Sequence, residues 1–398
     1  MAGVVRTRRL FYVPGFDPMP PRRYRELYRG EGRRQAEICG YTLELGAGSG
    51  TPYNWRVTAR IDGQETATRF EFLAWDDIVR ASMDVSIPRT FALLLRTVWL
   101  YLRSGALTAL FSLRAGPIIA ALYPVLMLLA QLAFGLAAGY LAYRSLEVVS
   151  APLAAAAALG VLWVCLAAFR RIDGRLYAYY LMQDYAFAAR HAGRTPPELR
   201  PRLSEFVERI AAARRGGADE VMIVGHSSGA WLAVVLAAEV LRRGPGQPQQ
   251  IALLTLGQAI PMVSFLPEAR ELRRDLRYLS GHPRVVWADV SAPGDGASFA
   301  LCDPVQVTGV APQGRPARWP VTISAAYSQT LSPQTLKKTR WRFFRRHIQY
   351  LCAFERPRDY DYFRITAGPH RLGDLLARRG NSRSRITRPC SPYRDTGQ

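Results

Sequence analysis

The sequence predicts an α/β fold with a doubly wound, mostly parallel sheet. Short, mostly apolar runs, as expected for buried strands, occur at 10–13, 221–224, 251–256 and 284–290, and the run at 221–224 has no polar gap. Helix-compatible segments occur between such runs, at 22–39, 198–215 and 229–243. Strands that alternate with helices pair in parallel, and functional sites of such sheets form where the strands end.

Composition limits the classes of function. The chain has 398 residues and a formal net charge of +22, almost entirely from arginine, since Lys337 and Lys338 are the only lysines. No nucleic-acid-binding motif accompanies this charge, so we expect no nucleic-acid partner and interpret the charge as facing an anionic bilayer. The five cysteines are scattered and show neither metal-ligand spacing nor a disulfide framework, which is typical of a reducing compartment. No long apolar run follows the basic N-terminal residues, so we predict no cleavable signal peptide.

Two uncharged segments interrupt the soluble pattern. Residues 115–143 and 148–169 lack charged side chains, and each is long enough to cross the roughly 20-residue span of a bilayer core as a helix. Arginines cluster at the outer ends of this pair, which predicts a hairpin in the inner (cytoplasmic) membrane with the soluble domain on the cytoplasmic side. Residues 87–113 carry Arg96 and Arg103 in an apolar background and predict an interfacial amphipathic helix. The alternative is a hairpin buried in a soluble core.

These segments divide the chain into four parts. Residues 1–86 form the N-terminal part of a soluble core and 87–175 the interfacial helix and hairpin. Residues 176–377 form the C-terminal part of the core, so the core is split in sequence and rejoined in space. Residues 378–398 are rich in arginine and serine and predict a disordered basic tail.

The most informative motif is Gly225-His226-Ser227-Ser228-Gly229, which lies between a predicted buried strand and a predicted helix. A sharp turn there projects the Ser227 hydroxyl from the end of the sheet, and two glycines allow the strand and helix to approach closely. The N-terminus of the helix then faces any negative charge that develops on a substrate. The alternative is a tight turn without chemistry.

Residues 219–243 resemble the nucleophile elbow of the α/β-hydrolase superfamily, in particular its lipase- and esterase-like serine hydrolases. The resemblance implies that Ser227 is the nucleophile. It also implies that a loop after the first strand supplies an oxyanion amide. Here that loop is 14–18, and the Phe16 N–H would act together with the Ser228 N–H. A plain β-turn is the alternative for this loop.

The same resemblance implies a chain order of serine, acid and histidine. Three aspartates follow or end the strand at 284–290, and we favour Asp295 because it lies in a Pro/Gly loop directly after it. Asp289 lies within the strand and Asp303 precedes a proline, where it could simply start a turn; both remain alternatives.

Among the five histidines, two come after this acid loop. We favour His347, which stands in a His-x-x-Tyr sequence resembling the terminal histidine loop of lipases, over His370 near the basic tail. His191 and His282 precede the acid loop, and His226 occupies an elbow position that usually serves packing.

The sequence thus predicts a membrane-anchored serine hydrolase that cleaves a lipid or other acyl ester with Ser227, His347 and Asp295. We expect no metal and no cofactor. One alternative is a catalytically silent scaffold that binds a lipid or protein at the membrane. Another is an acyltransferase or thioesterase with the same triad. The sequence leaves the oligomeric state open.

Overall fold

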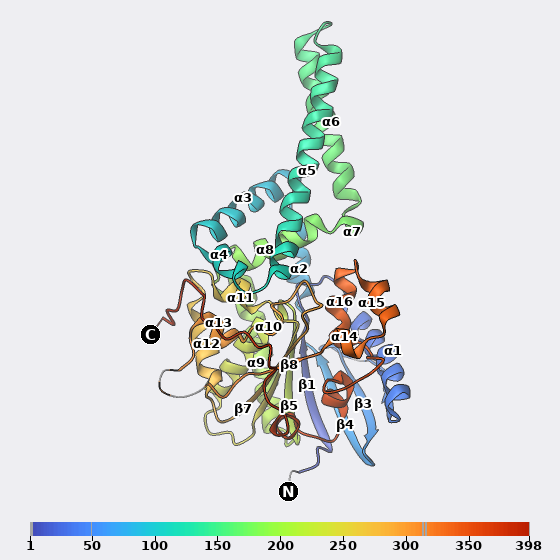
Figure 1. The fold of residues 1–398 in the computed structure, drawn as a ribbon, viewed down its shortest axis with the longest axis vertical. Helices are drawn as coiled ribbons and strands as arrows, with labels where there is room; N and C mark the ends of the chain where they lie inside the picture. Colours follow the sequence, from blue (N-terminus) through green and yellow to red (C-terminus); the bar gives the residue numbers. More distant parts are fainter. Residues whose placement is uncertain (1–2, 49, 313, 315–316, 398) are drawn as a thin grey trace.

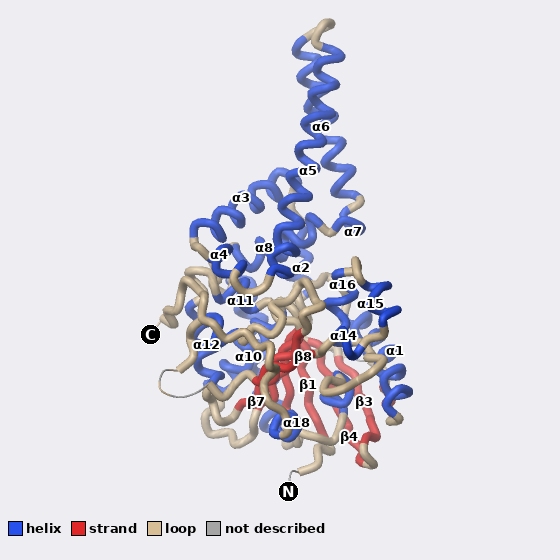
Figure 2. The backbone as a smooth tube through the Cα atoms, viewed as in Figure 1, coloured by secondary structure: helices blue, strands red, loops and turns tan. Residues whose placement is uncertain are grey.

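The computed structural model describes residues 3–48, 50–312, 314 and 317–397. Its centre is an eight-stranded sheet with helices packed around it, and two long helices project from one end (Figure 1). Figure 2 shows the strands gathered in the interior of the soluble part, at the end away from these helices. The protein is therefore a mixed α/β structure, as predicted.

The sheet has the strand order β2-β3-β4-β1-β5-β6-β7-β8. Only the pairs β2–β3 and β3–β4 are antiparallel, so the sheet is mostly parallel. The strands are β1 (Thr7–Val13), β2 (Thr42–Leu45), β3 (Asn54–Ile61), β4 (Gln64–Phe72), β5 (Glu220–His226), β6 (Ile251–Leu256), β7 (Val285–Ser291) and β8 (Val321–Ser324). The sequence did not predict β8, because an alternating run of only four residues, Val-Thr-Ile-Ser, is too short to be distinctive.

The helices before the elbow are α1 (Pro21–Cys39), α2 (Asp76–Met83), α3 (Ile87–Arg103), α4 (Ala106–Phe111), α5 (Ala115–Leu146), α6 (Ala151–Arg171), α7 (Asp173–Leu176), α8 (Ala178–Ala189), the 3₁₀ turn Pro197–Leu199 and α9 (Arg200–Arg215). Those after it are α10 (Gly229–Arg243), α11 (Ile260–Ser264), α12 (Arg270–Ser280), α13 (Pro304–Thr308), α14 (Tyr327–Thr330), α15 (Pro333–Thr339), α16 (Phe343–His347), the 3₁₀ turn Ile348–Leu351, α17 (Tyr362–Ala367) and α18 (Leu372–Ala377).

Helices cover both faces of the sheet. Tyr12 of β1 contacts the ring of Tyr24 in α1, whereas Gly225, paired with the next residue of β1, lies directly against α10. Because successive side chains of a strand point to opposite faces, α1 and α10 lie on opposite sides. The sheet is thus doubly wound.

The two sequence-separated parts of the core share this sheet through β1. It pairs in parallel with β4 on one side and with β5 on the other. At the end away from the long helices, the buried Arg8 of β1 forms an ion pair of 2.7 Å with Glu220 of β5. The Arg8 guanidinium also donates to the carbonyl oxygens of Gly368 and His370. A single side chain therefore connects the first strand, the elbow strand and the C-terminal segment.

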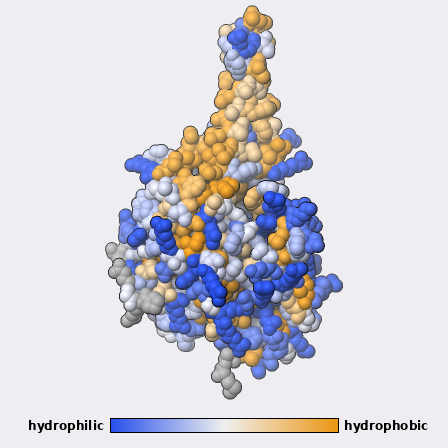
Figure 3. Space-filling model, in the orientation of Figure 1, coloured by the Kyte–Doolittle hydropathy of each residue, from blue (hydrophilic) through white to orange (hydrophobic). Residues whose placement is uncertain are grey.

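The projecting pair consists of α5 and α6, whose bounds are close to those predicted. Both are long and apolar enough to cross a membrane by length and composition. The two helices pack closely at Gly139. A Cβ there would lie only 2.8 Å from the Ala158 carbonyl oxygen. Their outer surface is apolar and exposed, with Phe134 and Leu159 59% and 68% exposed, and Figure 3 shows hydrophobic residues over most of this pair. Most of the pair stands clear of the rest of the chain, whereas the lower turns of α5 pack against it through Ile118 and Leu128.

The predicted interfacial helix at 87–113 is two helices rather than one. Helix α3 ends at Arg103, and α4 starts after Gly105, whose φ of 71° is left-handed and stops the helix. One side of α3 packs on the protein through Leu94 and Tyr101, while Leu95 and Trp99 are exposed. The amphipathic pattern of α3 is confirmed, and Gly105 is the reason that one predicted helix is two.

The predicted disordered tail also differs from the structure. Within the described residues, the segment after α18 runs along the soluble part and forms specific contacts. The Ile386 carbonyl accepts from the Asp303 N–H, and the Cys390 N–H donates to the Val307 carbonyl. Arg273 donates to the Asp395 carbonyl at 2.6 Å. Amino-acid composition does not indicate such backbone contacts, and the prediction of disorder was based on composition. Gln398 lies outside the described residues.

Candidate active site

Ser227 stands on a strained corner between β5 and α10. Its φ is 56°, a left-handed value that a residue with a side chain adopts only when its surroundings enforce it. A Cβ at Gly225 would lie 2.6 Å from the Ala233 side chain of α10, and one at Gly229 would lie 2.4 Å from backbone oxygens at the end of β1. Both glycines are therefore required by close approach, and the turn exposes the serine at the carboxyl edge of the sheet.

The structure brings His347 and Asp295 together at this edge. His347 ends α16, Asp295 lies in the loop after β7, and 2.8 Å separates Nδ1 of the histidine from Oδ2 of the aspartate. The same oxygen accepts a hydrogen bond of 3.0 Å from the Tyr350 hydroxyl, and Oδ1 accepts one from the Ala297 N–H. Every donor around this carboxylate stabilises its ionised form.

The ionisation of this pair follows from these contacts. Burial would raise the pKa of Asp295, but the facing His347 ring and the hydrogen bonds hold that pKa below its usual value. Burial would lower the pKa of His347, but the Asp295 carboxylate outweighs it and raises that pKa above 6.5. A carboxylate on Nδ1 also selects the tautomer in which Nε2 carries a lone pair. An imidazole held in this way is suited to accept a proton at Nε2.

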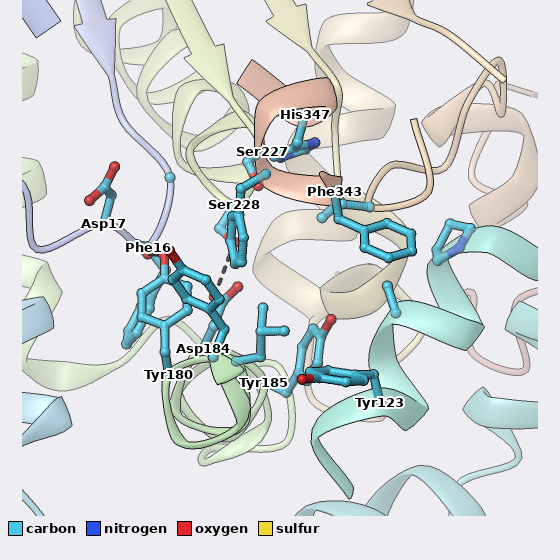
Figure 4. A pocket seen from close by; sticks show the side chains of 18 of the residues that line it. Phe16, Asp17, Tyr123, Tyr180, Asp184, Tyr185, Ser227, Ser228, Phe343 and His347 are labelled. Carbon is cyan, nitrogen blue, oxygen red and sulfur yellow. Dashed lines mark hydrogen bonds between the residues drawn. The ribbon is translucent and has the colours of Figure 1, made fainter. Parts of the chain in front are cut away.

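The Nε2 atom of His347 is buried and has no hydrogen-bond partner among the described residues. It lies at a cavity that Ser227 also lines, and Figure 4 shows the two side chains close together there. A buried, unpaired ring nitrogen is costly unless something occupies the cavity beside it. The serine hydroxyl and a substrate are the groups that can approach it.

His226, which the sequence analysis assigned to packing, also fixes the position of His347. Its Nε2 lies 3.0 Å from the His347 carbonyl oxygen, and the two rings are 4.7 Å apart between centroids. Burial, reinforced by the neighbouring His347 ring, lowers the pKa of His226 to about 3. The ring is neutral at ordinary pH and donates its N–H to that carbonyl. The elbow therefore holds the histidine loop as well as the serine.

The alternative acids and base lie elsewhere. Asp289 is buried within β7 and accepts a hydrogen bond of 2.6 Å from Thr255. Asp303 caps the N-terminus of α13. His370 is exposed and lies 3.1 Å from Asp62, at the end of the sheet opposite the elbow. None of the three contacts Ser227 or His347.

The loop after β1 lies against the elbow. A Cβ at Gly15 would be 3.1 Å from the Ser227 Cβ, so Gly15 approaches the serine directly. Neither the Phe16 N–H nor the Ser228 N–H donates to another described residue. The Tyr180 hydroxyl donates to the Phe16 carbonyl oxygen and so braces the loop from α8. Amides without a partner in this loop and at the start of α10 are the donors that an oxyanion would need.

A carboxyl group that the sequence analysis did not single out also lines the cavity. Asp184 of α8 accepts a hydrogen bond of 3.1 Å from the Ser228 hydroxyl (Figure 4). Burial raises its pKa to about 7, although Ser228 and His347 favour the ionised form. Its position could not be read from the sequence, because α8 carries no motif that indicates which face meets the elbow.

The cavity has a volume of about 600 Å³ and reaches from Ser227 to the base of α5. Most of its lining side chains are apolar or aromatic, including Ile119 and Tyr123 of α5 and Phe343 of α16. This size and lining are typical of a site for an apolar ligand with one polar reacting group. The described residues contain no group of three metal-ligating side chains.

Comparison with known families agrees with this geometry. The family model for lipase (class 3) matches residues 176–272, about a quarter of the chain. This match supports a lipase-like α/β-hydrolase family. It also indicates a hydrolase of the lipase or esterase type. The matched segment runs from the end of α7 to the start of α12 and contains Ser227, whereas Asp295 and His347 lie beyond it. No curated protein and no solved structure matches the chain.

Proposed function

We propose that the protein is a membrane-anchored serine hydrolase that cleaves an acyl ester of a lipid. The observation that carries the proposal is the buried, unpaired Nε2 of His347, held by Asp295 on its other nitrogen, at the cavity that Ser227 lines. A nucleophile, a base and an oriented acid are the parts that nucleophilic acyl transfer needs.

In the proposed reaction, the Ser227 oxygen attacks the ester carbonyl carbon while its proton passes to Nε2 of His347. Asp295 stabilises the resulting imidazolium. The carbonyl oxygen becomes an oxyanion and accepts hydrogen bonds from the Phe16 and Ser228 amides. The imidazolium then returns the proton to the leaving alcohol, and an acyl-serine remains. Water, deprotonated by the same imidazole, releases the acid and restores the serine.

The proposed anchor is the hairpin of α5 and α6. Helix α5 has 32 residues, which at about 1.5 Å per residue exceeds the roughly 30 Å of a bilayer core, so its lower turns can remain at the protein while the upper turns cross the bilayer. Arg170 and Arg171 stand at the base, and Arg144 at the tip is paired with Glu147. This bias supports a cytoplasmic soluble domain and an inner-membrane location.

The test is hydrolysis by the purified full chain in detergent, with p-nitrophenyl butyrate as the substrate. We expect an initial burst of p-nitrophenol, followed by steady release of butyric acid, and loss of both in Ser227→Ala. Adding glycerol as a competing acceptor shows whether water or an alcohol takes the acyl group. A chain without burst or turnover would instead be the silent scaffold considered above.

A further inference from the structure

The mouth of the cavity lies where the long hairpin meets the soluble part. Three elements border it: the base of α5, the junction of α7 and α8, and α16. The Tyr123 hydroxyl of α5 donates to the Leu176 carbonyl at 2.6 Å, and the Tyr177 ring lies 4.5 Å from that of Phe344. Ile119 lines the cavity yet is 62% exposed. The cavity therefore opens at the level at which α5 leaves the soluble part.

Arginines stand at this mouth without carboxylate partners. Arg175, at the end of α7, and Arg342, just before α16, line the cavity and are exposed. Neither forms an ion pair with a described residue, although many arginines of this chain do. Arg345 also lines the cavity, but its guanidinium lies 3.7 Å from Glu31. Two unpaired positive charges thus flank the opening from different elements.

The acids inside the cavity do not neutralise this charge. Asp17 is enclosed by hydrogen bonds from the Tyr24 hydroxyl and the Met19 N–H, and Asp184 by one from Ser228. Asp184 lies next to the elbow at Ser228, and Asp17 lies on the loop that carries Phe16 (Figure 4). The mouth is consequently positive, while the interior is mostly apolar and its two acids are engaged in hydrogen bonds.

The same charge continues along the base of the hairpin. Cations without an ion pair to any described residue are the half-buried Arg170 and the exposed Arg171, Lys337, Lys338 and Arg340. Figure 3 shows hydrophilic residues beside the base of the apolar pair. If the apolar pair α5 and α6 is inserted in a bilayer, cations beside its base lie at the level of the lipid head groups. An anion at this mouth would therefore come from a lipid rather than from bulk solution.

We infer that the substrate is a membrane lipid whose acyl ester lies close to an anionic phosphate head group. This inference rests on the proposed function. When the ester carbonyl is at Ser227, the acyl chain occupies the apolar cavity and the phosphate lies toward the mouth, between Arg175 and Arg342. Guanidinium groups recognise phosphate oxygens through charge-assisted hydrogen bonds. Neutral acylglycerols offer no such group.

The experiment uses the full chain in neutral detergent micelles. The substrates are phosphatidylglycerol and diacylglycerol with identical acyl chains. For wild type and each variant, the quantity compared is kcat/KM for phosphatidylglycerol divided by kcat/KM for diacylglycerol. We expect wild type to favour phosphatidylglycerol and the double variant Arg175→Gln/Arg342→Gln to lower this ratio about tenfold, because contacts between exposed charges are individually weak. Arg175→Lys/Arg342→Lys should retain most of the ratio.

The matched control is Arg215→Gln, an exposed arginine without an ion pair at the end of α9, which should leave the ratio unchanged. Added glycerol phosphate should not inhibit; strong inhibition would mean that a free phosphate compound occupies the site and would overturn the lipid assignment. Wild type that cleaves p-nitrophenyl butyrate but does not prefer phosphatidylglycerol would refute this inference and leave the proposed hydrolase intact. Wild type inactive on all three esters would refute both.

Discussion

The strongest quantitative prediction concerns Asp295→Asn. The carboxylate accepts from His347 Nδ1 at 2.8 Å and from the Tyr350 hydroxyl at 3.0 Å on one oxygen, and from the Ala297 N–H at 3.0 Å on the other. An asparagine amide must place its NH₂ against at least one of these donors. It also removes the charge that stabilises the imidazolium. Activity should therefore fall for two reasons. The histidine is no longer held in the tautomer that accepts a proton at Nε2, and the imidazolium formed in the transition state loses its stabilising charge.

The magnitude follows from electrostatics. Two charges about 4 Å apart at an effective dielectric constant near 20 interact by about 4 kcal/mol, which corresponds to about 10³-fold in rate. The tautomer effect adds to this, so we expect kcat/KM for p-nitrophenyl butyrate to fall by about 10³- to 10⁴-fold. Steady-state kinetics on the detergent-solubilised full chain measure the loss.

The matched control is Asp303→Asn. Asp303 is also buried, but it caps α13 by accepting from two backbone amides, a role that asparagine can fill with its amide oxygen. This variant should stay within about threefold of wild type, as expected for a cap-preserving change away from the site. If Asp295→Asn keeps more than a tenth of the activity, or if both variants lose it equally, the assignment of Asp295 is wrong.

Three further predictions use the same preparation. Because His347 must be neutral to act as a base and its pKa is raised, kcat/KM should fall with decreasing pH through an apparent pKa above that of an ordinary histidine, and Asp295→Asn should move this limb to lower pH. Arg8→Ala leaves Glu220 buried without its partner and should lower the free energy of unfolding in urea by about 3 kcal/mol; an unchanged midpoint contradicts this. Gly229→Ala places a Cβ against two backbone oxygens at 2.4 Å and should destabilise by about 2 kcal/mol and reduce activity; wild-type values for both would show that the turn is not tight.

The sequence predicted the parts of the fold that depend on local pattern. The elbow strand, its turn and its helix were visible because apolar runs, glycines and one serine occur in fixed order. The ends of α5 and α6 followed from the absence of charge. The predicted interfacial helix is interrupted at Gly105. The apolar pattern continues through this residue, but its positive φ does not fit a right-handed helix. The tail packs through backbone hydrogen bonds, which composition does not encode.

The residues of the candidate site could be predicted only where chain order and loop position narrow the choice of side chain. Those two features selected His347 and Asp295, which lie together in the structure. The supporting groups were not predictable. Tyr350 donates to the acid and His226 to the histidine carbonyl, and both contacts join segments more than 50 residues apart. Asp184 reaches the elbow from a helix before it, through packing that no motif records.

The most direct test of the account is labelling with a fluorophosphonate, which reacts only with an activated serine hydroxyl. The full chain in detergent is treated with the probe, digested and analysed by mass spectrometry. We predict one adduct, on Ser227, which is lost in Ser227→Ala and strongly slowed in His347→Ala. An unlabelled wild type, or an adduct that forms equally fast without the His347 ring, would contradict the claim that these two side chains act as nucleophile and base.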